Sequence, residues 1–241
     1  MKAAIIAAGS GERLRNCGIT VPKPLLRVAG RALIDYVLNA AASAGITQIA
    51  CIVNEESAGI EEHCRTEWPQ LAFEFIRRTT ASSMESLFAL RPLLQDGRFI
   101  LLTVDAVFAP AVLHRFLTAA AGFAQAHGVL ALSAFVDDEK PLWVSLSPDG
   151  RITALGAEAQ PAARSQGSAL VTAGYYMFDP AIFSEIDRAR QFGFTALRQF
   201  LKHLLSCGYR LYGQQMPKTV DVDRPEDIAV AEAFIRSGFT E

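Results

Sequence analysis

The sequence predicts an α/β fold with a mostly parallel central sheet and a later region of β-hairpins. Two observations carry this prediction. Apolar runs of strand length alternate with helical patterns throughout the first half, and the run over residues 99–104 is almost continuously apolar, which is typical of a strand buried on both faces of a parallel sheet. After residue 127 the pattern changes to short, closely spaced strands mixed with helices.

Strands and helices are expected to alternate regularly in the first half. Residues 3–7 form the first expected strand, and a loop with several Gly and Pro residues follows over 8–30. Segment 31–45 is an expected helix because its apolar residues recur at helical spacing and Gly45 can end it. The remaining expected elements of this half are strands at 49–53, 71–76 and 99–104 and helices at 56–66, 83–94 and 110–126.

The second half is expected to return to the same sheet after its hairpins. The expected strands are 129–136, 142–147, 151–155, 169–178, 209–213 and 219–223, and the expected helices are 180–187, 194–206 and 224–236. The Ser-Pro-Asp-Gly segment over 147–150 has the composition of a hairpin turn. We therefore expect a single domain over residues 1–241, with a binding site at the carboxyl ends of the parallel strands.

The composition excludes several classes of protein. With 51% hydrophobic and 20% charged residues, the chain has the composition of a packed globular protein. Lys and Arg number 23 against 25 Asp and Glu, and this balance disfavours binding to nucleic acid. No apolar stretch is long enough to span a bilayer. The four cysteines and four histidines show no zinc-site spacing, and the widely separated cysteines favour a reduced, cytoplasmic protein.

The loop after the first expected strand has the composition of a phosphate site. It reads Ala-Ala-Gly-Ser-Gly-Glu-Arg over residues 7–13, and Pro-Lys-Pro-Leu follows at 22–25. Glycines at positions 9 and 11 let backbone N–H groups approach an anion closely, while Arg13 and Lys23 add positive charge. The pattern is neither a Walker A loop nor Gly-x-Gly-x-x-Gly, because position 14 is Leu. The alternative interpretation is a glycine turn with solvated basic residues.

Carboxylates at or near the ends of two expected strands indicate a metal site. Asp105 ends the apolar strand 99–104, at the same sheet edge as the glycine loop, and one or two carboxylates with phosphate oxygens are the usual ligands of Mg²⁺. Asp221 and Asp223 lie on one face of the last expected strand. The alternatives are a turn or helix N-cap for Asp105, and a capping box with Glu226 for Asp223. The choice between Asp221 and Asp223 as second metal ligand stays open.

A group of small hydroxylic residues opens the third expected helix. The segment from 79 to 87 contains Thr80, Ser82, Ser83 and Ser86, whose donors could bind a base or a ribose. Ordinary N-capping of the helix is the alternative.

The opening of the chain resembles a known family. Ala-Ala-Gly-x-Gly-x-Arg, followed by Pro-Lys-Pro-Leu-x-x-Val-x-Gly-x-x-Leu-Ile-x-Tyr, is similar to the nucleotidyltransferases that make nucleotide-diphospho sugars and related head groups. The resemblance implies a Rossmann-like three-layer α/β/α fold and Mg²⁺-dependent transfer of a nucleotidyl group from an NTP to a phosphate, with release of pyrophosphate. The residues that it assigns to the nucleotide are Ala8, Gly9, Ser10, Gly11, Arg13 and Lys23. It assigns catalytic roles to Arg13, Lys23 and Asp105.

The second half carries weaker signals of an acceptor. Residues 1–127 are expected to bind the nucleotide and 128–241 the acceptor and part of the metal. Gly174, Tyr175 and Tyr176 belong to a segment that resembles the Gly-x-Tyr-x-Phe strand of sugar-type members. Their Glu-Lys-Pro motif, however, is matched here by Glu-Ala-Gln-Pro at 158–161, so the lysine that holds the acceptor phosphate is missing.

Three functions remain under consideration. We expect nucleotidyl transfer to a sugar 1-phosphate or similar small phosphomonoester. The hydroxyl-rich segment also resembles choline-phosphate cytidylyltransferases, so a CTP-dependent enzyme of that type is the close alternative. A non-catalytic nucleotide-binding protein on the same fold is the alternative from another class. The nucleotide, the acceptor and the oligomeric state stay open.

Overall fold

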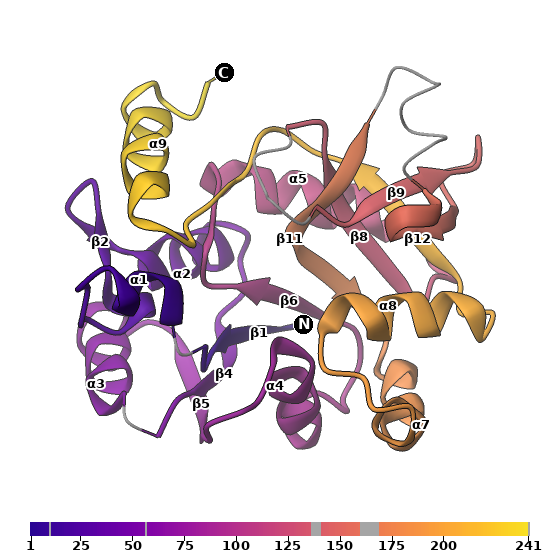
Figure 1. The fold of residues 1–241 in the computed structure, drawn as a ribbon, viewed down its shortest axis with the longest axis horizontal. Helices are drawn as coiled ribbons and strands as arrows, with labels where there is room; N and C mark the ends of the chain where they lie inside the picture. Colours follow the sequence, from indigo (N-terminus) through magenta and orange to yellow (C-terminus); the bar gives the residue numbers. More distant parts are fainter. Residues whose placement is uncertain (10, 56, 136–140, 160–168, 241) are drawn as a thin grey trace.

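The computed structural model describes residues 1–241 apart from 10, 56, 136–140, 160–168 and 241. The strands of its large central sheet are β1 (Lys2–Ala7), β4 (Gln48–Val53), β5 (Ala72–Arg77), β6 (Phe99–Thr103), β8 (Gly128–Ser133), β9 (Trp143–Leu146), β10 (Ile152–Leu155), β11 (Leu170–Phe178) and β12 (Leu211–Gln215). The order across the sheet is β10-β9-β11-β6-β1-β4-β5, and β8 pairs with both β11 and β12. Helices cover this sheet, which confirms the predicted α/β fold (Figure 1).

The centre of the sheet is parallel and buried on both faces. Strand β1 pairs in parallel with β4 and β6, and β4 pairs in parallel with β5. Along β1, Ala3 and Ile5 join one hydrophobic core while Ala4 and Ile6 join the other. This alternation is the reason why the strand reads as a continuous apolar run instead of an apolar-polar alternation.

Two layers of helices cover the two faces of the sheet. The helices of the first layer are α2 (Leu33–Ser43), α3 (Ala58–Glu67) and α5 (Pro110–Ala121), and those of the second are α4 (Ser83–Leu90), α7 (Ile186–Gln191) and α8 (Leu197–Ser206). Most of their bounds lie within a few residues of the predicted ones. The helix predicted over 110–126 already ends at Ala121, because Gly122 and a turn follow it. No helix in the described part of the chain is long and apolar enough to cross a membrane.

The second half joins the sheet through an antiparallel strand. Strand β11 pairs with β6 on one side and with β8 on the other. Its register shifts between Thr172 and Tyr176, and Gly174 lies in this shift with a φ of +80°. A Cβ at Gly174 would lie 2.9 Å from Thr103 Oγ1, so only glycine allows β11 to approach the end of β6 this closely.

A third, smaller core lies beside the carboxyl ends of the strands. Its residues include members of α1 (Glu12–Asn16), β2 (Arg27–Val28), β7 (Ala106–Val107), β13 (Val220–Asp221) and α9 (Pro225–Arg236). Strand β3 (Arg31–Ala32) pairs with β2. Two expectations differ from the structure here. The segment 8–30, predicted as a loop, contains α1, β2 and the 3₁₀ turn η1 (Lys23–Leu25). The strand predicted over 219–223 is limited to Val220–Asp221, because its partner β7 offers only two residues.

The remaining 3₁₀ turns are η2 (Arg91–Leu93), η3 (Gly156–Glu158) and η4 (Pro180–Glu185). The η2 turn continues α4, and η4 leads directly into α7.

Candidate active site

A cleft opens where β1 and β6 end side by side. Because the two strands are parallel and Ile6 is level with Thr103, the loop after β1 and Asp105 after β6 reach the same edge of the sheet. The cleft has a volume of about 390 Å³. Among its lining residues are the predicted Gly9, Gly11, Arg13, Lys23, Thr80, Ser82, Ser83, Ser86, Asp105 and Asp223. Ala8 is buried, and Ser10 lies outside the described residues.

Four charged side chains meet in this cleft. Lys23 Nζ donates to Asp105 Oδ2 at 3.0 Å and to Asp223 Oδ1 at 2.5 Å. Arg13 Nη1 donates to the other oxygen of Asp223 at 3.1 Å. The Lys23 side chain is only 10% exposed, whereas those of Asp105 and Asp223 are 29% and 43% exposed. A nearly buried ammonium group therefore holds together two carboxylates that belong to different parts of the chain.

The pKa values of the central pair shift in the directions expected of an ion pair. Burial by itself would lower the pKa of Lys23, but Asp105 and Asp223 outweigh it and raise this pKa above its usual value. Burial would likewise raise the pKa of Asp105, but Lys23 and a hydrogen bond from Thr103 outweigh it and hold the pKa below its usual range. Both groups are therefore charged at neutral pH.

The local backbone explains how Lys23 reaches this position. Pro22 precedes the η1 turn and Pro24 lies within it, so two fixed φ angles flank Lys23. Gly11 opens α1 with a φ of +61°, and a Cβ at this position would lie 3.3 Å from Lys23 Cβ. The glycine loop and the Pro-Lys-Pro turn thus pack against each other.

The two candidate metal carboxylates at the end of the chain take different positions. Asp223 faces Lys23 in the first cleft, whereas Asp221 lies on β13 beside Ala106 and lines a second cavity. The interpretation of Asp223 as a helix cap was wrong. The Asp227 carboxylate accepts from the backbone N–H groups of Asp223 and Arg224 instead, which leaves the Asp223 side chain available to the cleft.

The hydroxylic residues combine structural roles with a position in the cleft. Ser82 Oγ accepts from Glu85 N at 3.3 Å and caps α4, as the alternative interpretation expected. Thr80 Oγ1 and Ser86 Oγ lie 2.6 Å apart. All three also line the cleft, together with Ser83, so capping and ligand binding are compatible at this helix start.

A second cavity lies next to the first cleft, and Asp105 lines both of them. It has a volume of about 250 Å³ and shares Ser83, Thr103 and Asp105 with the first cleft. Its own lining residues include Thr172, Gly174, Tyr176, Arg198 and Asp221. Two of the three predicted acceptor residues, Gly174 and Tyr176, are therefore brought to one cavity.

Tyr175, the third predicted acceptor residue, lies elsewhere. It is fully buried and packs against Phe108 and Phe116, with ring centroids 4.7 and 5.2 Å away. The reason is the alternation of side chains along β11, which turns neighbouring residues to opposite faces. Arg198, in contrast, lines the second cavity but was not predicted, because an arginine in the first turn of an amphipathic helix resembles any solvated residue.

The donor set of the cleft fits a hard divalent cation. Asp105 and Asp223 offer carboxylate oxygens that already converge on one cation, the Lys23 ammonium group. Asp221 lines a cavity that Asp105 also lines. Carboxylate oxygens together with phosphate oxygens are the ligands that Mg²⁺ prefers.

Comparisons with known proteins find similar sequences over most of the chain. The family model for nucleotidyl transferases matches residues 2–238. The chain is 28% identical over 218 residues to the CMP-5'-(3-aminopropyl)phosphonate synthase of Streptomyces rubellomurinus, which covers 88% of this chain and 32% of that protein. It is 29% identical over 214 residues to the glucose-1-phosphate thymidylyltransferase of Streptomyces antibioticus, with 86% and 58% covered. The chain thus spans less than two thirds of the length of either relative.

A solved structure shares the fold over the whole chain. The inositol-1-phosphate CTP transferase from T. maritima superposes with a TM-score of 0.79 and covers 100% of this chain and 98% of that one. Its sequence identity is 19%, so this likeness concerns the fold.

The first prediction concerns the coupling between Lys23 and Asp105. A double-mutant cycle isolates this pair from the second partner, Asp223. The free energy of unfolding is measured by urea titration for the wild type, Lys23→Met, Asp105→Asn and the double variant. We expect a coupling energy of about 1–3 kcal/mol, below that of a fully buried pair because Asp105 is partly exposed.

The same cycle has a defined pH dependence. The pKa of Asp105 is lowered on folding, so its stabilisation is present above the unfolded value of about 4 and is lost as the pH falls through the folded value. The pKa of Lys23 is raised, so its stabilisation is present below about 10.4 and is lost as the pH rises through the folded value. A coupling energy near zero at pH 7, or one that increases in acid, would contradict this account.

Proposed function

Because the chain belongs to the nucleotidyl transferase family, we propose that it transfers a nucleotidyl group from an NTP to a sugar 1-phosphate or similar small phosphomonoester, with Mg²⁺ and with release of pyrophosphate. The observation that carries the proposal is the position of Asp105, which lines both cavities and is paired with Lys23. A group at this boundary can act on a bond that forms between two bound ligands.

The first cleft suits the nucleotide. Its glycine loop, Arg13 and Lys23 offer backbone N–H groups and positive charge to a triphosphate, and hydroxylic side chains line another part of the cleft. The second cavity suits the acceptor because it combines aromatic, hydroxylic and cationic groups in a smaller volume.

Arg198 is our candidate for the acceptor phosphate. The segment that resembles the Glu-Lys-Pro motif of sugar-type members, Glu-Ala-Gln-Pro at 158–161, contains no lysine. Arg198 lines the second cavity from the first turn of α8 and can supply the missing charge. A guanidinium group also suits a phosphate well, because it donates two parallel hydrogen bonds.

The reaction then needs no covalent intermediate with the protein. An oxygen of the acceptor phosphate attacks the α-phosphorus of the NTP in line, and the bond to the β-phosphate oxygen breaks as pyrophosphate leaves. Arg13 and Lys23 offset the negative charge that develops on the phosphate oxygens. Asp105, with Asp223 or Asp221, would hold Mg²⁺, which when bound neutralises further charge on the same phosphates.

A second candidate function uses CTP and an acceptor other than a sugar phosphate. One relative is a CMP-phosphonate synthase, and one structural neighbour is an inositol-1-phosphate CTP transferase. A choline-phosphate-type cytidylyltransferase belongs to this second candidate, and a protein that binds NTP without turnover is the remaining alternative.

One screen separates these candidates. Pyrophosphate release is measured with each of four NTPs against sugar 1-phosphates, inositol phosphate, an aminoalkylphosphonate and phosphocholine. Release with a sugar 1-phosphate supports the first candidate, whereas release with CTP and a different acceptor supports the second. Nucleotide binding without release in any combination would favour the non-catalytic alternative.

The second prediction tests the glycine loop. Gly11→Val places a branched side chain at a positive φ and against Lys23, so we expect nucleotide affinity to fall by at least about tenfold while the chain stays folded. Gly18→Val is the matched control, because Gly18 has a φ of +85° and a Cβ there would meet nothing within 4 Å. Equal affinities in the two variants would mean that the loop does not bind the nucleotide.

The third prediction compares the three carboxylates. Asp105→Asn keeps the shape of the side chain and removes its charge, so kcat should fall by about 10²–10³-fold and lose its dependence on Mg²⁺ concentration. Asp223→Asn and Asp221→Asn are measured in the same way, and the true second ligand should behave like Asp105→Asn. Full activity in Asp105→Asn would remove the metal-site proposal.

The fourth prediction concerns the acceptor cavity. Arg198→Gln should raise the acceptor KM by about 10- to 100-fold, since a hydrogen bond to a charged group contributes about 1.5–3 kcal/mol, and Arg198→Lys should recover part of the loss. Burial raises the pKa of Tyr176 to about 12, so its hydroxyl stays a donor at neutral pH.

Two tyrosine variants provide the comparison within one strand. Tyr176→Phe should change the acceptor KM more than the nucleotide KM, whereas Tyr175→Phe should change neither. An effect of Arg198→Gln confined to the nucleotide KM would place the acceptor elsewhere.

A further inference from the structure

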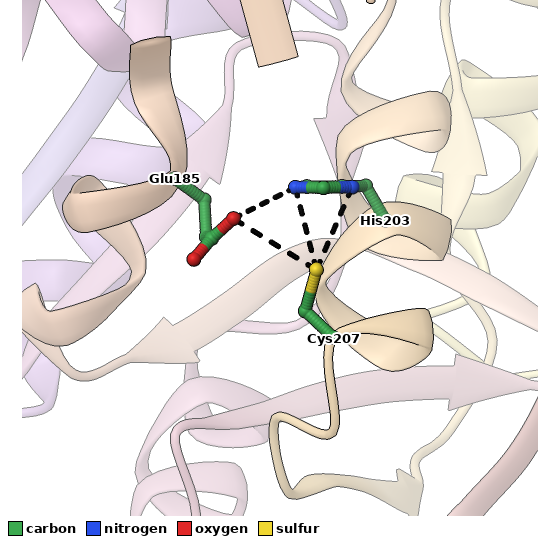
Figure 2. A group of neighbouring side chains, drawn as sticks. All are labelled: Glu185, His203 and Cys207. Atoms are coloured by element: carbon green, nitrogen blue, oxygen red, sulfur yellow. Dashed lines mark hydrogen bonds and ion pairs between the residues drawn. The ribbon is translucent and has the colours of Figure 1, made fainter. Parts of the chain in front are cut away.

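A second group of potential metal ligands lies away from the cleft. Glu185 ends η4, His203 lies in α8, and Cys207 directly follows that helix (Figure 2). His203 Nε2 is 2.9 Å from Glu185 Oε2, and Cys207 Sγ is 3.6 Å from His203 Nε2 and 3.8 Å from Glu185 Oε2. Cys207 Sγ is also 3.7 Å from His203 Nδ1, so the sulfur lies over the face of the imidazole ring. One carboxylate oxygen, one imidazole nitrogen and one sulfur thus lie within 4.8 Å of one another.

The fold brings these three side chains together from two segments. His203 and Cys207 are four residues apart, which places them on the same side of α8 one turn apart. Glu185 and His203 are each only 7% exposed, whereas Cys207 is exposed. The group is therefore fixed on its inner side and accessible from solvent at the sulfur.

Two of the three donor separations are close to those of a tetrahedral zinc site. With Zn–S of about 2.3 Å and Zn–N and Zn–O of about 2.0–2.1 Å, two tetrahedral donors lie about 3.6 Å apart if one is sulfur and about 3.3 Å apart otherwise. The two separations that involve Cys207 are 3.6 and 3.8 Å. The remaining one, at 2.9 Å, is that of a hydrogen bond. A metal ion bound to Nε2 lies in the plane of the imidazole ring, so its binding would separate Glu185 from His203 and turn the ring until Nε2 faces the Cys207 sulfur.

Glu185 has two further polar contacts, with Tyr209 and Arg188. Tyr209 donates to Oε1 at 3.3 Å, on the oxygen that does not face His203. Arg188 Nη1 lies 3.5 Å from both oxygens, and its side chain is 65% exposed, so it can move into solvent when a cation binds. The fourth tetrahedral position would be filled by water on the exposed side.

We propose that Glu185, His203 and Cys207 form a binding site for Zn²⁺ or a similar borderline transition-metal ion. Binding replaces the Sγ–H proton and any proton on Nε2, both of which are released to solvent. The mixed oxygen, nitrogen and sulfur set discriminates against Mg²⁺, which prefers oxygen ligands only. The site is thus chemically distinct from the carboxylates of the cleft.

A bound ion would connect α8 to the segment η4–α7. The last turn of α8 carries His203, and its first turn carries Arg198, which lines the second cavity. Metal binding at one end would therefore hold the helix whose other end faces the proposed acceptor site. The proposal does not depend on the proposed function, because the site is defined by its own three side chains.

Zn²⁺ binding to the reduced full-length chain provides the test. Calorimetric titration with Zn²⁺ should give one site that resists excess Mg²⁺, and Zn²⁺ should raise the melting temperature. Co²⁺ should give a sulfur-to-metal charge-transfer absorption. Cys207→Ser should abolish this absorption and weaken Zn²⁺ affinity by at least about tenfold.

Two controls make the outcome decisive. Cys17→Ser changes another exposed cysteine, and Asp105→Asn removes a carboxylate of the cleft, and both should bind Zn²⁺ like the wild type. Absence of Zn²⁺ binding in the wild type, binding unchanged in Cys207→Ser, or binding lost only in Asp105→Asn would each overturn the proposal. Because Cys207 is exposed, its replacement by serine should leave the fold intact.

Discussion

The arrangement of the cleft depends on one nearly buried ammonium group. Lys23 lies between Asp105 and Asp223, which are 82 and 200 residues away in sequence. Two carboxylates that face each other without a cation would repel, and one of them would be driven toward protonation. Lys23 keeps both charged and close together. Because burying the ammonium group costs desolvation energy, the net stabilisation is smaller than the coupling between the charges.

Backbone hydrogen bonds hold the segments that carry Asp105 and Asp223 next to each other. Strand β13 pairs with β7, and the Val222 N–H donates to the Asp105 carbonyl at 3.0 Å. The chain that leads to α9 is therefore attached to the turn that carries Asp105. Asp227 caps the helix start, so the Asp223 side chain is not consumed by capping and can face Lys23. A short two-stranded ladder and one cap thus determine which carboxylate enters the cleft.

The second cavity exists because β11 runs antiparallel beside β6. This pairing places the register shift of β11 next to the end of β6, where Gly174 allows the two backbones to approach. Asp105 consequently borders two cavities with different linings. The parallel half supplies the glycine loop and the hydroxylic helix start, and the antiparallel half supplies Tyr176 and Arg198.

The sequence by itself determined the order of strands and helices, the glycine loop, the Pro-Lys-Pro turn and the position of Asp105. These features are encoded locally, in apolar periodicity, in glycine and proline, and in a polar residue that directly follows a buried strand. Periodicity also sufficed to place Tyr176 and Gly174 on a strand of the second half, although it did not show that Tyr175 turns into the core.

Only the tertiary structure showed which residues from distant segments lie next to each other. It separated Asp223 from Asp221, gave the capping role to Asp227, and brought Arg198 and the group of Glu185, His203 and Cys207 to their places. The sequence showed no zinc-site spacing, because Glu185 lies 18 residues before His203 and joins it through the packing of η4 against α8. Such neighbourhoods depend on which faces of the sheet the helices cover and on single backbone hydrogen bonds, and neither is readable from local residue patterns.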